Sequence, residues 1–281
     1  MAKKDLPIIP SDRADDLHNL EIADSADLVL FMAGNQFMAM DELIADFQQD
    51  FPDINNIFYE TLPPGLALKQ ILSGGAVYRN DVLNVSADIY TSVNQKGMDI
   101  LENSGHILNG DYHLYLHNRL TLMVPEGNPA DVTSVSDLGK GDVRVSQPDP
   151  ANEDIAFHIM DMYRQAGGDK LVRRIMEEKR AEGTTIYTIV HHRETPLRIA
   201  KKTVDAGPVW ATEVIHAQNS GLAFEVVEPG EDLDQREHIN YYICKLVNAP
   251  HPQNAQKFIN YILSSPAQQI YKKYGFVPYS N

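Results

Sequence analysis

Short apolar runs alternate with amphipathic helical repeats along most of this chain, and this alternation is the feature that most limits its fold. Residues 28–32 form a continuous apolar run suited to a strand buried on both faces. After a turn at residues 34–36, apolar residues recur at helical spacing as far as Phe47. Residues 57–59 and the helical pattern that starts at Leu66 repeat this arrangement. The alternation predicts an α/β fold with mixed, mainly parallel sheets and flanking helices.

The turns that follow these strands are where such a fold binds ligands, because the carboxyl ends of parallel strands meet at one edge of the sheet. A third strand is expected at residues 82–85, with a helix from about Val93 to Glu102 after it. Glycine lets the backbone approach a ligand closely, and the amides of Asn and Gln both donate and accept hydrogen bonds. The candidate contacts in the three turns are Gly34, Asn35, Gln36, Pro64, Gly65 and Ser86.

These turn residues also have plain structural interpretations, which stay open at this point. Asn is a favourable N-cap, a role that is compatible with ligand contact. Pro64 has no side-chain chemistry, so its turn would offer only the N–H of Gly65 or Leu66, or would be purely structural.

A second series of strands and helices follows a turn-rich cluster at residues 125–129, which indicates a passage between two lobes. The length of 281 residues suits two domains at roughly 150 residues each. Strands are expected at residues 143–146, 187–190, 209–212 and 241–246, and helices at 154–166, 171–182 and 195–203, with two amphipathic helices near the end of the chain.

The densest polar cluster, residues 191–195, lies between a predicted strand and the start of a helix. Exposed backbone N–H groups and the helix dipole favour an anion there, and the Arg193 guanidinium would add a forked contact. The alternative is a solvated turn. His191 and His192 are adjacent and lack the i, i+4 spacing of paired metal ligands on a helix, so no metal is expected. Trp210, the only tryptophan, is either a core residue or a wall of the ligand site.

Charge and composition exclude several classes of partner. The formal net charge of −15 disfavours non-specific binding to nucleic acid or anionic lipid, so any anion must meet a local site. No apolar run approaches the roughly 18 residues of a membrane span. The lone cysteine, Cys244, lies in an alternating apolar run, which favours a small buried hydrophobe.

The common signatures of catalysis are absent from the sequence. It contains no Gly-x-Ser-x-Gly, no Gly-x-x-x-x-Gly-Lys, no His-Glu-x-x-His and no pair of cysteines. We therefore expect neither an enzyme nor a cofactor.

Four local sequences, taken in their order along the chain, carry a resemblance to a known family. They are residues 31–35, residues 81–88, which resemble "DVFASAD", residues 118–129, which resemble "NRLVLVVPKGNP", and the ending at 264–276. Together they resemble the type II periplasmic-binding-protein-like solute receptors of ABC transporters, and within these the group of molybdate and tungstate receptors.

The resemblance implies two α/β lobes with a ligand cleft between them that closes like a hinge. Domain I would comprise residues 27–117 and 241–281, domain II residues 118–240, and residues 1–26 would be a flexible arm and a candidate membrane tether. The resemblance also implies an ABC permease as partner and a location in the periplasm or on the outer face of the membrane, with the signal removed.

The resemblance also assigns ligand contacts residue by residue. The family's first oxyanion contact, a Ser, falls on Asn35, and its second falls near Gly65, so both hydroxyls are missing. The contacts in domain II fall near Asn152 and Asp154, on His192, and on Trp210, where the family often has Tyr.

These departures favour a small organic anion whose carboxylate meets Arg193 and whose body stacks on Trp210. The alternatives are a receptor for molybdate, tungstate or sulfate, an intracellular ligand sensor, and an enzyme with His191 or His192 as acid or base and Asp154 as its partner.

Overall fold

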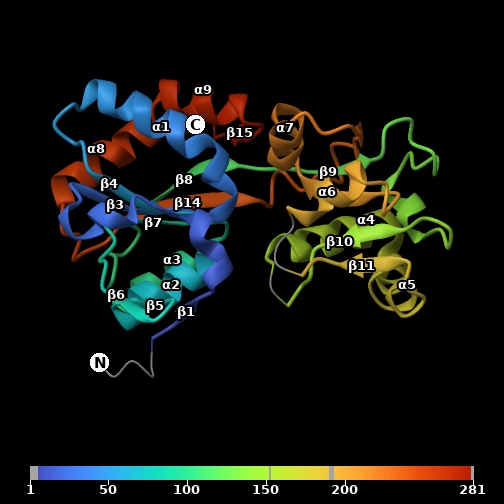
Figure 1. Ribbon diagram of the computed structural model, residues 1–281, viewed down its shortest axis with the longest axis horizontal. Helices are drawn as coiled ribbons and strands as arrows, with labels where there is room; N and C mark the ends of the chain where they lie inside the picture. Colours follow the sequence, from blue (N-terminus) through green and yellow to red (C-terminus); the bar gives the residue numbers. More distant parts are fainter. Residues whose placement is uncertain (1–5, 152, 190–192, 280–281) are drawn as a thin grey trace. The chain divides into compact units, whose positions relative to one another are not determined.

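The computed structural model describes residues 6–151, 153–189 and 193–279. The chain forms two compact units, which are described separately (Figure 1). Unit 1 comprises the chain as far as Leu116, together with Asn240–Lys273 and the residues from Pro278. Unit 2 comprises His117–Ile239 and Tyr274–Val277.

A seven-stranded sheet forms the centre of unit 1, in the order β15-β8-β14-β7-β3-β4-β2. β3 pairs in parallel with both β4 and β7, whereas β14 pairs antiparallel with β7 and β2 pairs antiparallel with β4. The strands are β2 (Leu17–His18), β3 (Leu28–Phe31), β4 (Ile57–Glu60), β7 (Ile89–Ser92), β8 (Tyr112–His117), β14 (Asn240–Lys245) and β15 (Val277–Pro278).

Helices cover both faces of this sheet, and its central strands are therefore buried throughout (Figure 1). Phe47 of α1 packs on Phe258 of α8, with ring centroids 5.2 Å apart. One face carries α1 (Phe37–Asp50), α8 (Pro252–Ile262) and α9 (Ser265–Lys273), and the other carries α2 (Pro64–Ser73) and α3 (Gln95–Asn103). Cys244 lies buried in β14, as its apolar surroundings predict.

The start of the chain differs from the loose arm expected over residues 1–26. β1 (Ile8–Ile9) pairs in parallel with β5 (Ala76–Tyr78), and β2 pairs with β4. The 3₁₀ helices η1 (Ser11–Asp16) and η2 (Leu20–Ser25) connect these strands. The sequence of this segment has two prolines, six acidic residues and little periodicity, but two-residue strands need only one inward side chain each, and Ile9 is 1% exposed.

The expected third strand is displaced along the chain. Residues 82–85 overlap β6 (Asp81–Leu83), which forms an antiparallel hairpin with β5 away from the central sheet. The strand beside β3 is β7, whose residues lie between the expected strand at 82–85 and the expected helix from about Val93. Because Thr91 and Ser92 are polar, the sequence of β7 lacks the continuous apolar run typical of a buried strand, although both residues are buried.

Unit 2 contains two small sheets and a long helical region. β9 (Leu120–Val124) lies between β12 (Gly207–Trp210) and β13 (Glu225–Val227), and β10 (Val145–Gln147) pairs in parallel with β11 (Thr185–Tyr187). The helices are η4 (Val135–Gly139), α4 (Ile155–Arg173), the π-helical turn η5 (Arg174–Glu178), α5 (Lys179–Ala181), α6 (Glu194–Ala200) and α7 (Ala211–Asn219).

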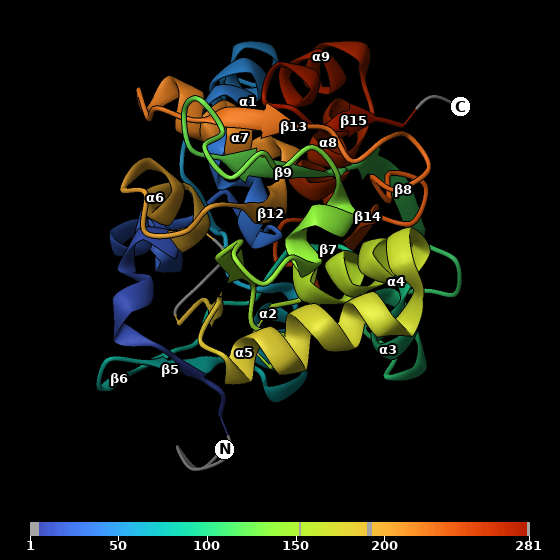
Figure 2. The ribbon, with the colours of Figure 1, turned by 90° about the vertical axis from the view of Figure 1, so that its right-hand side faces the viewer.

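Two glycines break the long helical region near its middle. Gly167 and Gly168 depart from helical dihedral angles, and Gly168 has a φ of +69°. The segments before and after this break are the yellow-green and yellow helices in Figure 2.

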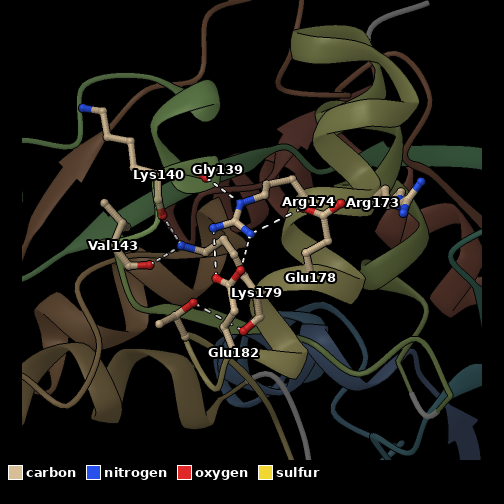
Figure 3. A network of polar contacts seen from close by, with 9 residues as sticks. Gly139, Lys140, Val143, Arg173, Arg174, Glu178, Lys179 and Glu182 are labelled. Carbon is tan, nitrogen blue, oxygen red and sulfur yellow. Dashed lines mark hydrogen bonds and ion pairs between the residues drawn. The ribbon is translucent and has the colours of Figure 1, made fainter.

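A buried lysine fastens the second segment to the rest of unit 2. The Lys179 ammonium donates to the carbonyl oxygens of Lys140 and Val143 (Figure 3). Beside it, Arg174 forms a forked pair with the Glu182 carboxylate, at 2.6 and 2.9 Å.

Candidate ligand-binding site

Three turns of unit 1 meet at the carboxyl edge of the central sheet. In the parallel register Leu30 lies beside both Tyr59 and Ile89, so β3, β4 and β7 end on the same side. The turns that follow are Gly34–Gln36 after β3, the segment from Thr61 to Pro64 after β4, and the residues after Ser92.

Gly34 allows the first two turns to touch. A Cβ at this position would lie 2.9 Å from the backbone oxygen of Thr61, closer than packed carbon and oxygen atoms approach. The absence of a side chain at Gly34 therefore sets the spacing of the two turns.

Asn35 has one unmet hydrogen-bonding group. Its side chain is 5% exposed, and its Nδ2 donates to the hydroxyl of Tyr241. Within the described residues, its Oδ1 is buried and has no hydrogen-bond partner. A buried amide oxygen without a donor costs about 1–3 kcal/mol, so Asn35 is the strongest candidate contact in unit 1.

In Gln36, by contrast, both the amide oxygen and the amide nitrogen have hydrogen-bond partners. It is fully buried, its Oε1 accepts from Tyr115 at 2.8 Å and Tyr271 at 2.7 Å, and its Nε2 donates to Thr91 at 3.2 Å. These hydrogen bonds anchor the first turn to the core.

The second turn presents the start of α2. Pro64 occupies the first helical turn, and the N–H groups of Leu66 and Ala67 both donate to Pro63. Among the described residues, no acceptor meets the N–H of Gly65, and the space around Gly65 Cα is open. An unmatched N–H at a helix start favours an anion.

Ser86 is not brought together with these residues. It precedes β7, so it lies at the amino edge of the sheet, where it lines a cavity of about 160 Å³ together with Gln70 and His106. Ser92 ends β7 at the same edge as Asn35, and a correct register for β7 would have selected it.

In unit 2, Trp210 lies beside His158 of α4, a residue that the sequence analysis did not single out. It ends β12, is 3% exposed, and its ring centroid lies 6.0 Å from that of His158 in the first turn of α4. Asp154, exposed and without a side-chain capping bond, precedes α4 by one residue. The signal for His158 was its i+4 spacing from Asp154, which places both on one helix face.

Burial favours the neutral form of the His158 imidazole. Burial lowers its pKa, the Asp161 carboxylate opposes this shift, and His238 reinforces it. A neutral imidazole has one N–H donor and one acceptor nitrogen, which suits a polar ligand better than a fixed cation would.

The polar cluster at residues 191–195 is only partly described. Asn152, His191 and His192 lie outside the described residues. Arg193 is half-buried directly before α6. Arg198, which the sequence analysis did not consider, donates to Ser146, Glu194 and Tyr187 and ties α6 to β10 and β11.

In the ranges that the structure describes, no group of three or more His, Cys, Asp or Glu side chains could hold a metal ion. No helix in the described part of the chain is long and apolar enough to cross a membrane.

The sequence model of a family described as bacterial extracellular solute-binding proteins matches residues 28–277. The chain belongs to this family. A relative in Bacillus subtilis, the putative ABC transporter substrate-binding lipoprotein YvgL, is 24% identical over 207 residues, which is 73% of this chain and 72% of that protein. The family resemblance identified from the sequence is thereby confirmed, and the family is one of extracytoplasmic transport receptors that are generally non-enzymatic.

Solved structures confirm the type II periplasmic-binding-protein fold class. The substrate-binding domain of a putative molybdenum ABC transporter from Clostridium difficile has a TM-score of 0.69 at 15% identity and covers 90% of this chain and 99% of that one. The periplasmic molybdate-binding protein of Azotobacter vinelandii has a TM-score of 0.68 at 18% identity, covering 90% and 100%. The sulfate-binding protein SubI of Mycobacterium tuberculosis has a TM-score of 0.68 at 16% identity, covering 89% and 85%.

Proposed function

We propose that this protein is an extracytoplasmic receptor that closes on a small organic anion and delivers it to an ABC permease, without catalysis. The observation that carries the choice of ligand is the buried Asn35 Oδ1, which has no donor among the residues that the structure describes. A fully ionised oxyanion offers only acceptors, whereas a hydroxy acid or amino acid brings the O–H or N–H that this oxygen needs.

The proposal assigns candidate contacts to each unit separately. In unit 1, the Gly65 N–H would meet a negatively charged oxygen, and Asn35 would meet the donor group. In unit 2, Arg193 would pair with the carboxylate, while Trp210 and His158 would contact the organic body. Gly34 and Gln36 would hold the first turn in place, and Ser86 is left out because it lies at the other edge of the sheet.

An inorganic oxyanion is the second candidate. It is favoured by the open N–H of Gly65 and by the structural neighbours, whose names state that they bind molybdate and sulfate. Backbone N–H groups would then replace the missing hydroxyls.

The first test is the melting temperature of the purified protein with lactate, acetate, molybdate and sulfate. A ligand that binds only the folded state stabilises it by about 2.7 kcal/mol at 100 times its dissociation constant. We expect a shift with lactate that exceeds the shift with acetate, since acetate has no donor group. A shift confined to molybdate or sulfate would support the second candidate and contradict the first.

The second test is Arg193→Ala, measured by calorimetric titration with the anion that shifts the melting temperature. Loss of a charge-assisted contact should weaken binding by roughly tenfold to a hundredfold. The matched control is Arg173→Ala, an exposed arginine of the same unit, which should leave binding unchanged. Unaltered affinity in Arg193→Ala would contradict the assigned contact, and chemical conversion of the anion would contradict a receptor without catalysis.

A further inference from the structure

In unit 1, the buried carboxyl group of Glu60 faces the side-chain amide of Gln70. Glu60 ends β4 in the interior of the central sheet, and its residue is 0% exposed. Gln70 of α2 is 1% exposed and donates from Nε2 to Glu60 Oε2 at 3.3 Å. No ion pair to Glu60 occurs among the described residues, so no cation compensates a charge on this carboxyl.

The two groups also leave one oxygen each without a donor. Glu60 Oε1 and Gln70 Oε1 are both buried and lack hydrogen-bond partners within the described chain. The hydrogen bond from Gln70 Nε2 to Glu60 Oε2 already joins the two side chains that carry these oxygens. One proton on Glu60 Oε1, donated to Gln70 Oε1, would satisfy both oxygens and close a ring of two hydrogen bonds.

We propose that Glu60 is held as the neutral carboxylic acid and closes an acid–amide pair with Gln70, which fixes the first two turns of α2 against β4. The proton on Glu60 Oε1 comes from solvent, and no covalent bond between Glu60 and Gln70 forms. Glu60 and Gln70 are positioning residues, because neither belongs to the turns that present Asn35 and Gly65.

The charged and titratable groups near this pair are Asp16, Arg13 and His18. Asp16 of η1 is 4% exposed and accepts from Thr61 Oγ1 at 3.4 Å, and Arg13 pairs with it at 3.1 Å. His18 of β2 lies 3.5 Å from Thr61 Oγ1. Burial raises the pKa of Glu60 to about 8, the hydrogen bond from Gln70 opposes this, and the Asp16 carboxylate adds to it.

The sign of the resulting pH dependence follows from proton linkage. The folded state keeps the Glu60 proton up to about pH 8, whereas the unfolded chain releases it near the ordinary value of 4.5. The stabilising contribution is therefore complete below pH 4.5 and is lost progressively as the pH rises to 8. Across this window the unfolding equilibrium constant rises about tenfold per pH unit through this group alone.

The experiment compares wild type with Glu60→Gln by urea unfolding between pH 5 and 8. An amide at position 60 can pair with Gln70 but cannot titrate, so the ratio of the two unfolding constants should change about tenfold per pH unit. The matched control is Glu21→Gln, the same change at an exposed position of unit 1, which should follow wild type at every pH. Parallel curves for wild type and Glu60→Gln would overturn the proposal.

A second measurement does not depend on any variant. The ¹³C resonance of the Glu60 carboxyl should titrate well above the usual range of glutamate, and titration near 4.5 would overturn the neutral acid. Hydrogen exchange in α2, corrected for intrinsic rate, should lose protection over the same pH window in wild type and not in Glu60→Gln. Any effect on ligand affinity rests on the proposed function, whereas these readouts require no ligand and stand or fall separately.

Discussion

Asn35 and Gln36 show at the scale of single residues how neighbours in one turn take different roles. Both are amides, and the sequence favours them equally as ligand contacts. Gln36 meets hydroxyls from β7, β8 and α9, whereas the Oδ1 of Asn35 has no donor within the described chain. Segments far away in the sequence decide this difference, so inspection of the turn cannot reveal it.

Gly34→Ala tests whether close contact between the first two turns matters. Its Cβ would meet the backbone oxygen of Thr61 at 2.9 Å, and backbone cannot swing away as a side chain can. We expect a loss of about 1–3 kcal/mol in the free energy of unfolding, measured by urea titration. Gly65→Ala is the matched control, because its Cβ meets open space and its loss should stay below about 0.5 kcal/mol. Equal effects of the two changes would refute the role of Gly34.

Lys179→Met tests the anchor of the second helical segment (Figure 3). The change leaves the carbonyl oxygens of Lys140 and Val143 without their donor. We expect a loss of about 1–3 kcal/mol in unfolding free energy at pH 7, against almost none for the exposed Lys170→Met.

The Lys179 anchor also has an expected pH dependence. Burial lowers the pKa of Lys179 from 10.5 to about 8, so the folded state binds fewer protons than the unfolded chain between these values. The stability of wild type relative to Lys179→Met should therefore rise with pH above 8. A ratio of unfolding constants that is constant from pH 8 to 10 would contradict the shift.

At the scale of elements, two short strands near the start of the chain extend two different sheets: β1 pairs with β5 in a small sheet, and β2 pairs with β4 at the edge of the central sheet. β1 and β2 are two residues long, too short for any periodic pattern to indicate them. They form because β5 and β4 offer unpaired backbone groups at sheet edges.

Ile9→Ala tests whether β1 is part of the packed structure. Ile9 is 1% exposed, whereas its neighbour Ile8 is 71% exposed on the opposite face of the strand. Truncation of a buried isoleucine should cost about 2–4 kcal/mol in unfolding free energy, and Ile8→Ala should cost little. If both changes are silent in thermal and urea unfolding, the segment is a loose arm after all.

At the scale of the whole molecule, the chain divides into units that are each assembled from separated stretches. Unit 1 draws on both ends of the sequence, and unit 2 draws mainly on its middle. The net charge of −15 adds no general attraction for an anion, so affinity must come from local N–H groups and cations such as Gly65 and Arg193 in the proposed site.

The sequence by itself determined the α/β class and the family, because both depend on local patterns: strand and helix periods, and four motifs in order. It also identified the turns after β3 and β4 as the regions to search. The tertiary structure alone decided that β7 is the third central strand, that Ser86 lies at the opposite edge, and that His158 lies beside Trp210. It also decided that Glu60 faces Gln70. These facts depend on strand register and on contacts between distant segments, which no local pattern of residues encodes.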